Sequence, residues 1–289
     1  MENFTDTLVN LALAIIMLGI GLSLKISDFK NLFRNPKAII IGLVSQLVLL
    51  PLIAYIVTSV SNLSAEIKVG IIIIAICPVG ASSNLIVHLF KGNLALSIAL
   101  TIINSILIPF TVPILVKMAL KIYLAKDTEI SLPILDSIVH IFFNVLIPAL
   151  LGITFRHYFE RIALILEKPL KFILPAILGS VFAIKIFFST GSANNGLSLN
   201  EILHITPFVL ALNIGGMYAG YYLARYFKLA LKFRLTVAIE TGLQNTALAL
   251  VVTGILLNNH EMEKPVIVYA LFTFFTAILF AWYFMRKKK

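Results

Sequence analysis

Long apolar runs recur along the whole chain and constrain its fold more than any other feature. Each is long enough, at about 17 to 25 residues, for a helix to cross a hydrocarbon core about 30 Å thick. The nine runs cover residues 7–24, 38–58, 67–90, 94–118, 133–155, 169–188, 202–224, 233–257 and 265–285. The sequence therefore predicts an all-α polytopic membrane protein with nine transmembrane helices.

Composition supports this class and a single domain. Hydrophobic residues make up 60% of the chain and charged residues 12%, and the mean hydropathy is +1.02. A soluble domain is far less apolar than this. The connections between the runs are short, and the longest is a moderately polar stretch around 188–202. We therefore expect one transmembrane domain over residues 1–289.

Charge predicts the orientation in the membrane. The opening MENFTDT carries Glu2 and Asp6 but no basic residue, unlike the n-region of a cleaved signal. With the N-terminus outside and nine crossings, 17 of the 23 basic residues fall on the cytoplasmic side and 5 outside, with Lys185 in or near a span. We expect a multi-pass protein of the cell inner membrane with a cytoplasmic C-terminus. Loop charge facing anionic lipid headgroups accounts for the net charge of +10 without nucleic acid.

Motifs for enzymes and metal proteins are missing from the sequence. It contains no GxxxxGK[ST], HExxH or CxxC pattern, and its five histidines lack metal-ligand spacing. Ser83 and His88 are five residues apart across a predicted helix break, which is a poor arrangement for a nucleophile and its base. We predict a protein that is not an enzyme and has no organic cofactor. The sequence implies no oligomer.

Two apolar runs are interrupted by residues that weaken a helix. Pro78 and Gly80 break the third run, which should unwind near 78–83, and Gly242 begins a similar break in the eighth. Unwound backbone at membrane depth is tolerated where it is buried in protein or lines a watery cavity. Glu240 precedes the second break, and a lone charge at the membrane centre costs roughly 3 kcal/mol, so it needs a partner.

The matching places of the two broken spans predict inverted repeats. Residues 1–130 form a first, incomplete repeat of four helices, and residues 131–289 form a second repeat of five. Spans 3 and 8 then correspond, and they cross near the midplane with their loosened carbonyl groups facing one another. This arrangement is typical of a secondary transporter.

Four sequence blocks carry a resemblance to the bile acid:sodium symporter family. They are ETGLQN at 240–245, CPxGxxSN at 77–84, KGNLALSIALT at 91–101 and GLVSQLVLLP at 42–51. The chain resembles the nine-span bacterial form over nearly its whole length. The resemblance implies a panel domain of spans 1, 5 and 6 that moves against a core domain of the other six. It also implies sodium-coupled import of an organic anion by alternating access.

The resemblance further implies two sodium ions as coupling ions. The first site would use Ser83, Asn84, Ser97, Thr101 and Glu240, and the second Gln46, Glu240, Thr241, Leu243 and Gln244. Sodium is a hard cation, and these residues offer it hydroxyl, amide, carbonyl and carboxylate oxygens. Ser97 and Thr101 are four residues apart and so share one face of their helix.

Substrate contacts are expected beside the breaks and on the last span. The candidates are Gly80, Ala81, Ser82, Asn245, Thr273 and Thr276. Helix N-termini at the breaks favour an anion. The resemblance implies that this anion is a bile salt-like amphiphile or a small carboxylate of the pantothenate kind. Val79 and Ala81 depart from the common pattern of the family, as do Thr273 and Thr276, so a bile salt should not be assumed.

Three alternatives remain open on sequence alone. Polar residues of membrane helices often act as interhelical glue without any ligand, and Asn104, Asn144 and Asn213 fit that role or cavity lining better than ion binding. A metalloid exporter of the related superfamily would need a reactive thiol, and Cys77 is the single cysteine. Another ion-coupled solute carrier is also compatible.

Overall fold

The computed structural model describes most of the chain, and every regular element in the described part is helical. The described residues are 2–24, 35–77, 79, 82–124, 134–166, 169–170, 173, 180 and 197–286. No strand occurs among them. The predicted all-α class is therefore confirmed for this part of the chain.

The helices follow the apolar runs. In chain order they are α1 (Glu2–Ser23), α3 (Pro36–Val44), η2 (Ser45–Leu49), α4 (Leu50–Ser59), α5 (Ala65–Ile76), α6 (Ser82–Leu89), α7 (Leu94–Leu124), α8 (Ile134–Ile141), η3 (Phe142–Leu146), α9 (Ile147–Tyr158), α11 (Leu199–Tyr226), α12 (Leu231–Gly242), α13 (Thr246–Leu250), η4 (Val251–Leu256) and α14 (His260–Arg286). The η elements are π-helical turns set between α-helical stretches, so α3–η2–α4 forms one continuous rod, as does α8–η3–α9.

Within the described residues, six helical stretches are long and apolar enough to cross a membrane. They are Pro36–Ser59, Leu94–Leu124, Leu135–Tyr158, Leu199–Tyr226, Leu231–Leu256 and His260–Arg286. The first predicted span coincides with α1, and the third with α5 and α6, which are separated by a break. Most of the sixth predicted span, 169–188, lies outside the described residues. The count of nine spans and the division into two repeats stay predictions.

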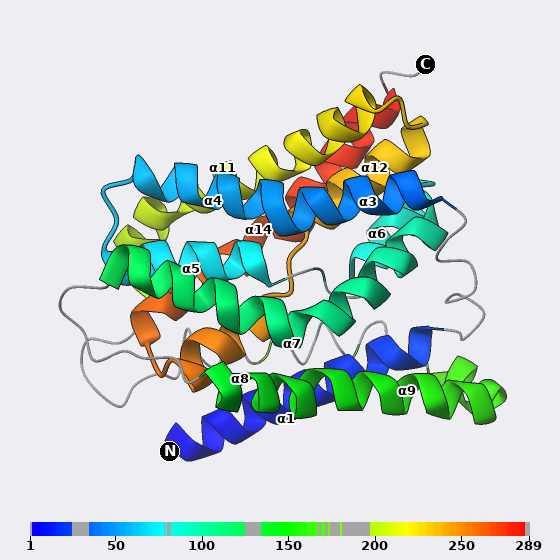
Figure 1. The fold of residues 1–289 in the computed structure, drawn as a ribbon, viewed down its shortest axis with the longest axis horizontal. Helices are drawn as coiled ribbons and strands as arrows, with labels where there is room; N and C mark the ends of the chain where they lie inside the picture. The colour runs from blue at the N-terminus through cyan, green and yellow to red at the C-terminus, as the bar shows by residue number, and fades with distance from the viewer. Residues whose placement is uncertain are drawn as a thin grey trace.

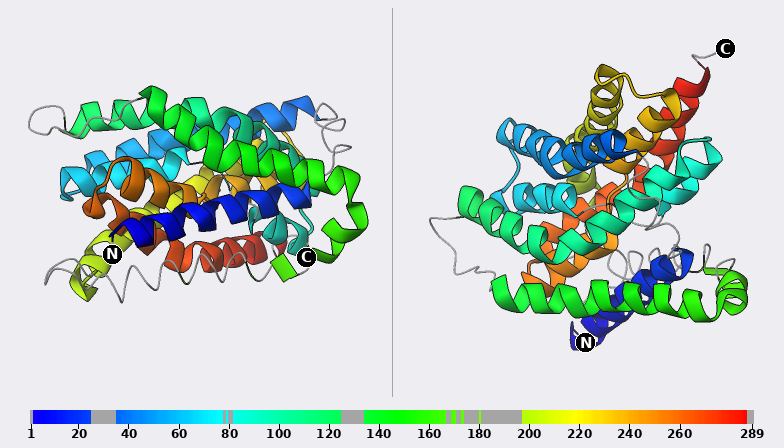
Figure 2. Two further views of the ribbon diagram at one scale, coloured as in Figure 1. Left: turned by 90° about the horizontal axis from the view of Figure 1, so that it is seen from below. Right: turned by 45° about the vertical axis from the view of Figure 1, so that its right-hand side comes forward.

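The helices are arranged in layers (Figures 1 and 2). α1, α8 and α9 lie together along one side of the molecule, with α1 packed against α9 and η3. The other layers contain α5 and α7, and beyond them α3–η2–α4, α11, α12 and α14. α11 packs against α12 and α14, and α5 packs against α7 and α14. This second group of helices surrounds the residues of the candidate site.

Two glycines allow α1 and α9 to approach closely. A side-chain carbon on Gly152 would overlap the Leu18 carbonyl oxygen, and one on Gly21 would overlap that of Ala149. Small residues of this kind let membrane helices pack backbone to backbone. The buried Arg156 adds a hydrogen bond from its guanidinium to the Leu22 carbonyl oxygen, 2.5 Å away. α1 is thereby fastened to α9 along its second half.

Both predicted breaks are present, and they touch. α5 ends at Ile76 and α6 begins at Ser82, so the chain leaves the helix slightly earlier than the sequence predicts. α12 ends at Gly242, and α13 begins at Thr246. The Asn245 amide donates to the Cys77 carbonyl oxygen at 3.3 Å. The unwound segments of two helices far apart in the sequence therefore meet inside the protein.

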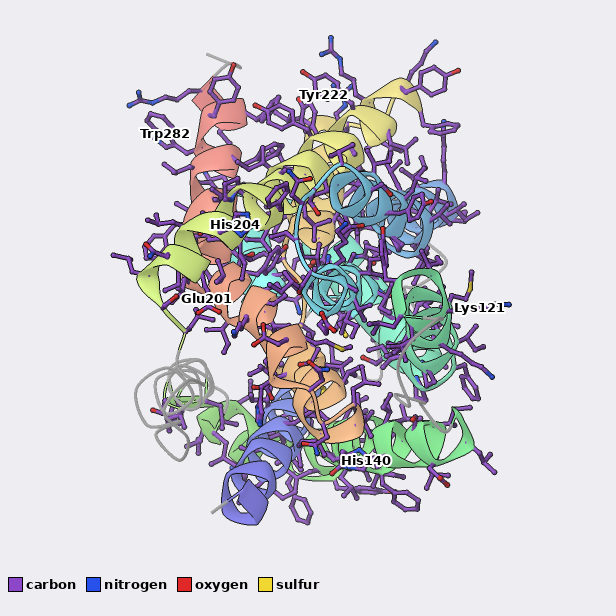
Figure 3. All side chains as sticks on the ribbon, turned by 90° about the vertical axis from the view of Figure 1, so that its left-hand side faces the viewer. Lys121, His140, Glu201, His204, Tyr222 and Trp282 are labelled. Atoms are coloured by element: carbon purple, nitrogen blue, oxygen red, sulfur yellow. The ribbon has the colours of Figure 1, made fainter. Side chains whose placement is uncertain are left out.

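Charged and aromatic residues mark the two ends of α11 and α14. Tyr222 and Trp282 lie toward the same end (Figure 3), where Arg286 stacks over the Trp282 ring at 4.0 Å. At the other end Lys264 bridges Glu201 and Glu261, each at 2.5 Å. Aromatic and basic side chains of this kind are typical of membrane–water interfaces. Both helices thus extend from one predicted interface to the other.

The glycine contact between α1 and α9 gives a stability prediction. Gly152→Ala should lower the thermal stability of the detergent-purified protein, because overpacking of this kind costs about 1–3 kcal/mol. Gly215→Ala is the matched control, since its new carbon would lie 3.6 Å from Ile53 in ordinary contact. Melting of the two variants is compared by fluorescence-detected size exclusion. Equal melting temperatures would show that α1 and α9 are not packed as described.

Candidate functional site

Glu240 lies in the last turn of α12, in the most enclosed span of the protein. Its side chain is 0% exposed. Every residue of the central 18-residue apolar stretch of Leu231–Leu256 is buried inside the protein, compared with 22% for Leu135–Tyr158. Protein rather than lipid therefore surrounds the carboxylate. No lysine or arginine among the described residues pairs with it.

Several oxygen atoms lie close to the carboxylate. There are too few hydroxyl hydrogens among them for each close pair of oxygens to share a hydrogen bond. The Ser97 hydroxyl lies 2.5 Å from Glu240 Oε1 and 2.5 Å from Asn84 Oδ1, yet its single hydrogen can serve only one of these acceptors. The buried Ser83 side chain also contacts the carboxyl group. Within the described residues, Glu240 Oε2 accepts no hydrogen bond. Such a cluster is suited to a small cation, which all of these oxygens can bind at once.

Gln46, which lies in η2, also contacts Glu240. Pro51 follows this π-helical turn and has no N–H to offer, and Leu50 N donates to Ser45 O, five residues back. π-helical turns often occur at functional sites. Gln46 Nε2 donates to the Glu240 carbonyl oxygen at 2.9 Å, and Gln46 Oε1 accepts from Asn104 Nδ2 at 2.5 Å. Asn104 Oδ1 is buried without a hydrogen-bond donor in the described part of the chain.

The break after α12 adds further oxygens. Leu243 is extended, with φ −101° and ψ 105°, so the helix stops there and its last carbonyl groups lose their usual partners. Gln244 Nε2 donates to the Thr241 carbonyl oxygen at 2.8 Å. Gln244 Oε1 is buried and accepts no hydrogen bond from the described residues. Asn245 Oδ1 caps α13 by accepting from Leu248 N at 3.0 Å.

The structure brings the residues of both predicted sodium sites together. In the first set, Ser97 contacts Asn84 and Glu240, and Thr101 donates to the Ser97 carbonyl oxygen at 3.0 Å. In the second set, Gln46 and Gln244 bind the main chain of α12 at Glu240 and Thr241. The two sets share Glu240 and are continuous with each other. Their assignment to sodium stays a prediction.

The predicted substrate residues are less closely grouped. Gly80 and Ala81 lie outside the described residues, and so does the side chain of Ser82. Asn245 lies at the break, as expected. Thr273 and Thr276 of α14 take part in hydrogen bonds with Asn213, and Thr273 is 2% exposed. These two threonines therefore lie in a packed network between helices, where contact with a substrate would require them to rearrange.

Sequence reasoning missed one member of this network and undervalued one residue beside the oxygen cluster. Tyr269 was not singled out, although Tyr269, Thr273 and Thr276 follow at i, i+4 and i+7 along one face of α14. Asn104 was interpreted as interhelical glue or cavity lining. Its hydrogen bond to Gln46 agrees with glue, but it also places a free amide oxygen beside the candidate ion ligands.

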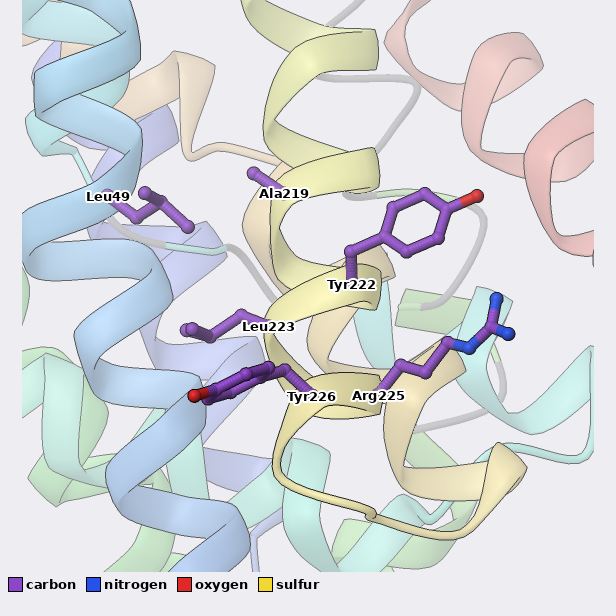
Figure 4. A pocket seen from close by; sticks show the side chains of 6 residues that line it. All are labelled: Leu49, Ala219, Tyr222, Leu223, Arg225 and Tyr226. Carbon is purple, nitrogen blue, oxygen red and sulfur yellow. The ribbon is translucent and has the colours of Figure 1, made fainter.

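A surface groove lies apart from these residues. It has a volume of about 670 Å³ and is lined by Leu49, Ala219, Tyr222, Leu223, Arg225 and Tyr226 (Figure 4). None of these residues belongs to the carboxylate cluster or to the Asn213 network. Among the described residues, no group of three His, Cys, Asp or Glu side chains could hold a metal ion. The oxygen cluster around Glu240 is therefore the candidate site.

The fold and the site together define the class of protein. A polytopic helical membrane protein that buries one carboxylate among oxygen donors, where two interrupted helices meet, has the features of an ion-coupled transporter. The family model described as Sodium Bile acid symporter family matches residues 10–195. The chain belongs to this family, and the resemblance noted in its sequence is confirmed.

Individual relatives agree with this family. The "Uncharacterized sodium-dependent transporter YocS" of Bacillus subtilis (strain 168) is 33% identical over 83% of this chain and 71% of the relative. "Probable sodium/metabolite cotransporter BASS1, chloroplastic" of Arabidopsis thaliana is 28% identical over 83% of this chain and 57% of the relative. "Sodium/bile acid cotransporter 4" of Homo sapiens is 30% identical over 84% and 54%. The chain thus spans little more than half the length of these last two relatives.

The oxygen cluster gives a prediction about sodium. Ser97→Ala should reduce the rise in melting temperature that sodium chloride produces over choline chloride, because the hydroxyl joins Asn84 to Glu240. Ser105→Ala on the same helix is the matched control, since its hydroxyl only bonds the Thr101 carbonyl oxygen one turn back. The control should keep the full sodium effect. If both variants keep it, Ser97 does not contribute to the ion site.

Proposed function

We propose that this protein is a secondary active transporter that couples sodium entry to the import of an organic anion. The observation that carries the proposal is the fully buried Glu240 carboxylate, which has oxygen neighbours and no basic partner among the described residues. A permanently uncompensated charge of this kind is costly inside a membrane protein. A bound cation would neutralise this charge. It would also coordinate the neighbouring oxygens that lack hydrogen-bond donors.

The chemistry of the ligands favours sodium over a transition metal. The cluster offers a carboxylate, hydroxyls, amide oxygens and main-chain carbonyls, with no imidazole or thiolate among the contacts described. Hard cations prefer oxygen ligands of this kind. The first ion would bind between Asn84, Ser97 and Glu240, with Ser83 and Thr101 beside them. The second would bind where the side chains of Gln46 and Gln244 approach the end of α12, with the carbonyls of Thr241 and Leu243.

Alternating access would come from movement between two groups of helices. We assign α1, α8 and α9 to the panel and the helices around Glu240 to the core. The close glycine contacts between α1 and α9 support the movement of these helices as one body. Sodium binding would order the two breaks, which belong to different helices and touch at Asn245 and Cys77. Movement of the core against the panel would then expose the substrate alternately on each side.

The substrate is proposed to be an organic anion. The N-terminus of α6 at Ser82 faces the break in its span, and free N–H groups with a positive dipole end favour an anion there. The printed names of the relatives include metabolite and bile acid cotransporters. We place the protein in the cell inner membrane, with the N-terminus outside, because that orientation puts most basic residues in the cytoplasm.

Uptake into proteoliposomes tests the proposal. Wild-type protein should accumulate at least one member of a panel of bile salts and small carboxylates when sodium is present outside, and choline should not replace sodium. Glu240→Ala and Gln244→Ala should abolish this stimulation because each removes an oxygen ligand. Glu66→Gln changes an acid in the first turn of α5, away from the site, and should retain uptake. Unchanged sodium dependence in both site variants would contradict the proposal.

Membrane potential provides a second measurement. Two sodium ions that enter with one monovalent anion move one net positive charge, which gains roughly 2.3 kcal/mol per 100 mV of inside-negative potential. A potassium diffusion potential set with valinomycin should therefore increase the initial rate of uptake. A rate that is unaffected by potential would indicate a stoichiometry of one sodium ion per monovalent anion.

A further inference from the structure

The Gly242 carbonyl group, at the end of α12, accepts hydrogen bonds from two other helices. Asn213 Nδ2 of α11 donates to this oxygen at 2.7 Å. The Tyr269 hydroxyl and the Thr273 hydroxyl of α14 donate to it as well, the latter at 3.3 Å. A carbonyl oxygen has two lone pairs, so three donors saturate it. This oxygen is therefore fully engaged by side chains.

The donors are themselves held in place. Asn213 Oδ1 accepts from the Thr276 hydroxyl at 2.6 Å, and Asn213 Nδ2 also lies 3.1 Å from the Tyr269 oxygen. Asn213 and Tyr269 are both 0% exposed. A side-chain carbon on Gly242 would overlap Met217, which lies one turn after Asn213 on α11. Packing and hydrogen bonds thus fix the end of α12 against the same helix.

The position of this carbonyl determines where its neighbours point. The Gly242 oxygen and the Leu243 nitrogen belong to one rigid peptide plane. Holding that plane restricts ψ of Gly242 and φ of Leu243. These dihedrals join it to the two neighbouring peptide planes, which carry the carbonyls of Thr241 and Leu243, the proposed ligands of the second ion. Glu240 precedes Gly242 by two residues on the same helical turn. The network therefore supports, from α11 and α14, the same end of α12 that Gln46 contacts from η2.

We propose that Asn213 and Tyr269 are positioning residues for sodium, which hold the unwound end of α12 in the conformation that binds the ion. The inference rests on the proposed function and deepens it. Neither residue is among the proposed ligands, and the oxygen of each already accepts a hydrogen bond, Asn213 Oδ1 from Thr276 and the Tyr269 oxygen from Asn213. Their contribution is to orient the main-chain carbonyls that face the ion. Loss of either contact should weaken sodium binding and leave the fold in place.

Tyr269→Phe is the sharpest test because it removes one oxygen and keeps the buried ring. Equilibrium binding of ²²Na⁺ to the purified protein is measured, so no substrate has to be known. The half-saturating sodium concentration should rise about tenfold, the lower end of the range for groups that orient metal ligands. Tyr221→Phe is the matched control, since Tyr221 is a buried tyrosine of α11 whose ring packs against Phe284. It should bind sodium as the wild type does.

Asn213→Ala and Thr276→Val extend the test along the network. Asn213→Ala removes the donor to Gly242 and should raise the half-saturating concentration at least as much as Tyr269→Phe. Thr276→Val removes only the hydrogen bond that Thr276 donates to Asn213 Oδ1, so it should raise the half-saturating concentration less. Asn213 and Tyr269 act on the same oxygen, so their effects should not be independent. The half-saturating sodium concentration of the double variant should therefore rise by less than the product of the two single fold-changes.

Three outcomes separate this inference from the function on which it rests. A wild-type protein that binds no sodium contradicts the proposed function itself. Wild-type binding that Tyr269→Phe and Asn213→Ala leave unchanged overturns the positioning role but not the function. Variants that keep the wild-type half-saturating concentration but contain less folded protein also overturn it, because they show a purely structural contribution. A shifted concentration with full binding capacity supports the inference.

Discussion

The candidate site depends on how the negative charge of one buried carboxylate, Glu240, is compensated. Glu240 lies in the most enclosed span, and its described neighbours are hydroxyl, amide and carbonyl groups rather than basic side chains. Hydrogen bonds from neutral groups offset part of the cost of burying a charge, but they do not neutralise it. Under the proposed function, a mobile cation would complete the compensation and could leave again, which a lysine or arginine cannot do. This difference would make the carboxylate useful for coupling.

The broken helices leave main-chain carbonyl groups available that a continuous helix would use in its own hydrogen bonds. In an unbroken helix the carbonyls of Glu240, Thr241 and Gly242 would each accept from an amide four residues ahead. In this protein each accepts instead from a side chain, and the donors are Gln46, Gln244 and Asn213 respectively. Gln46 and Asn213 come from other helices, η2 and α11, whereas Gln244 belongs to the break itself. The break is thus stabilised partly from outside itself, by helices that must pack against it.

The sequence predicts the helical class and both breaks, because each has a local or compositional signal. The meeting of Glu240 with Ser97, which lie 143 residues apart, was implied only by the family resemblance. Long apolar runs identify spans, proline and glycine identify breaks, and an isolated acid identifies a site. The role of Asn213 has no such signal, since its partner Gly242 lies 29 residues away on another helix. Asn104 and Gln46 are separated by 58 residues in the same way. Contacts of this kind follow from packing, which periodicity does not specify.

The π-helical turn η2 shows how local and distant constraints combine. Pro51 removes one main-chain donor, which is a local effect that the sequence displays. A π-helical turn inserts one residue and so rotates everything before it relative to a regular α-helix. Gln46 lies within that turn, and its amide bridges the end of α12 and Asn104 of α7. The proline therefore acts on the candidate site through the direction in which Gln46 points, five residues away, without itself belonging to the oxygen cluster.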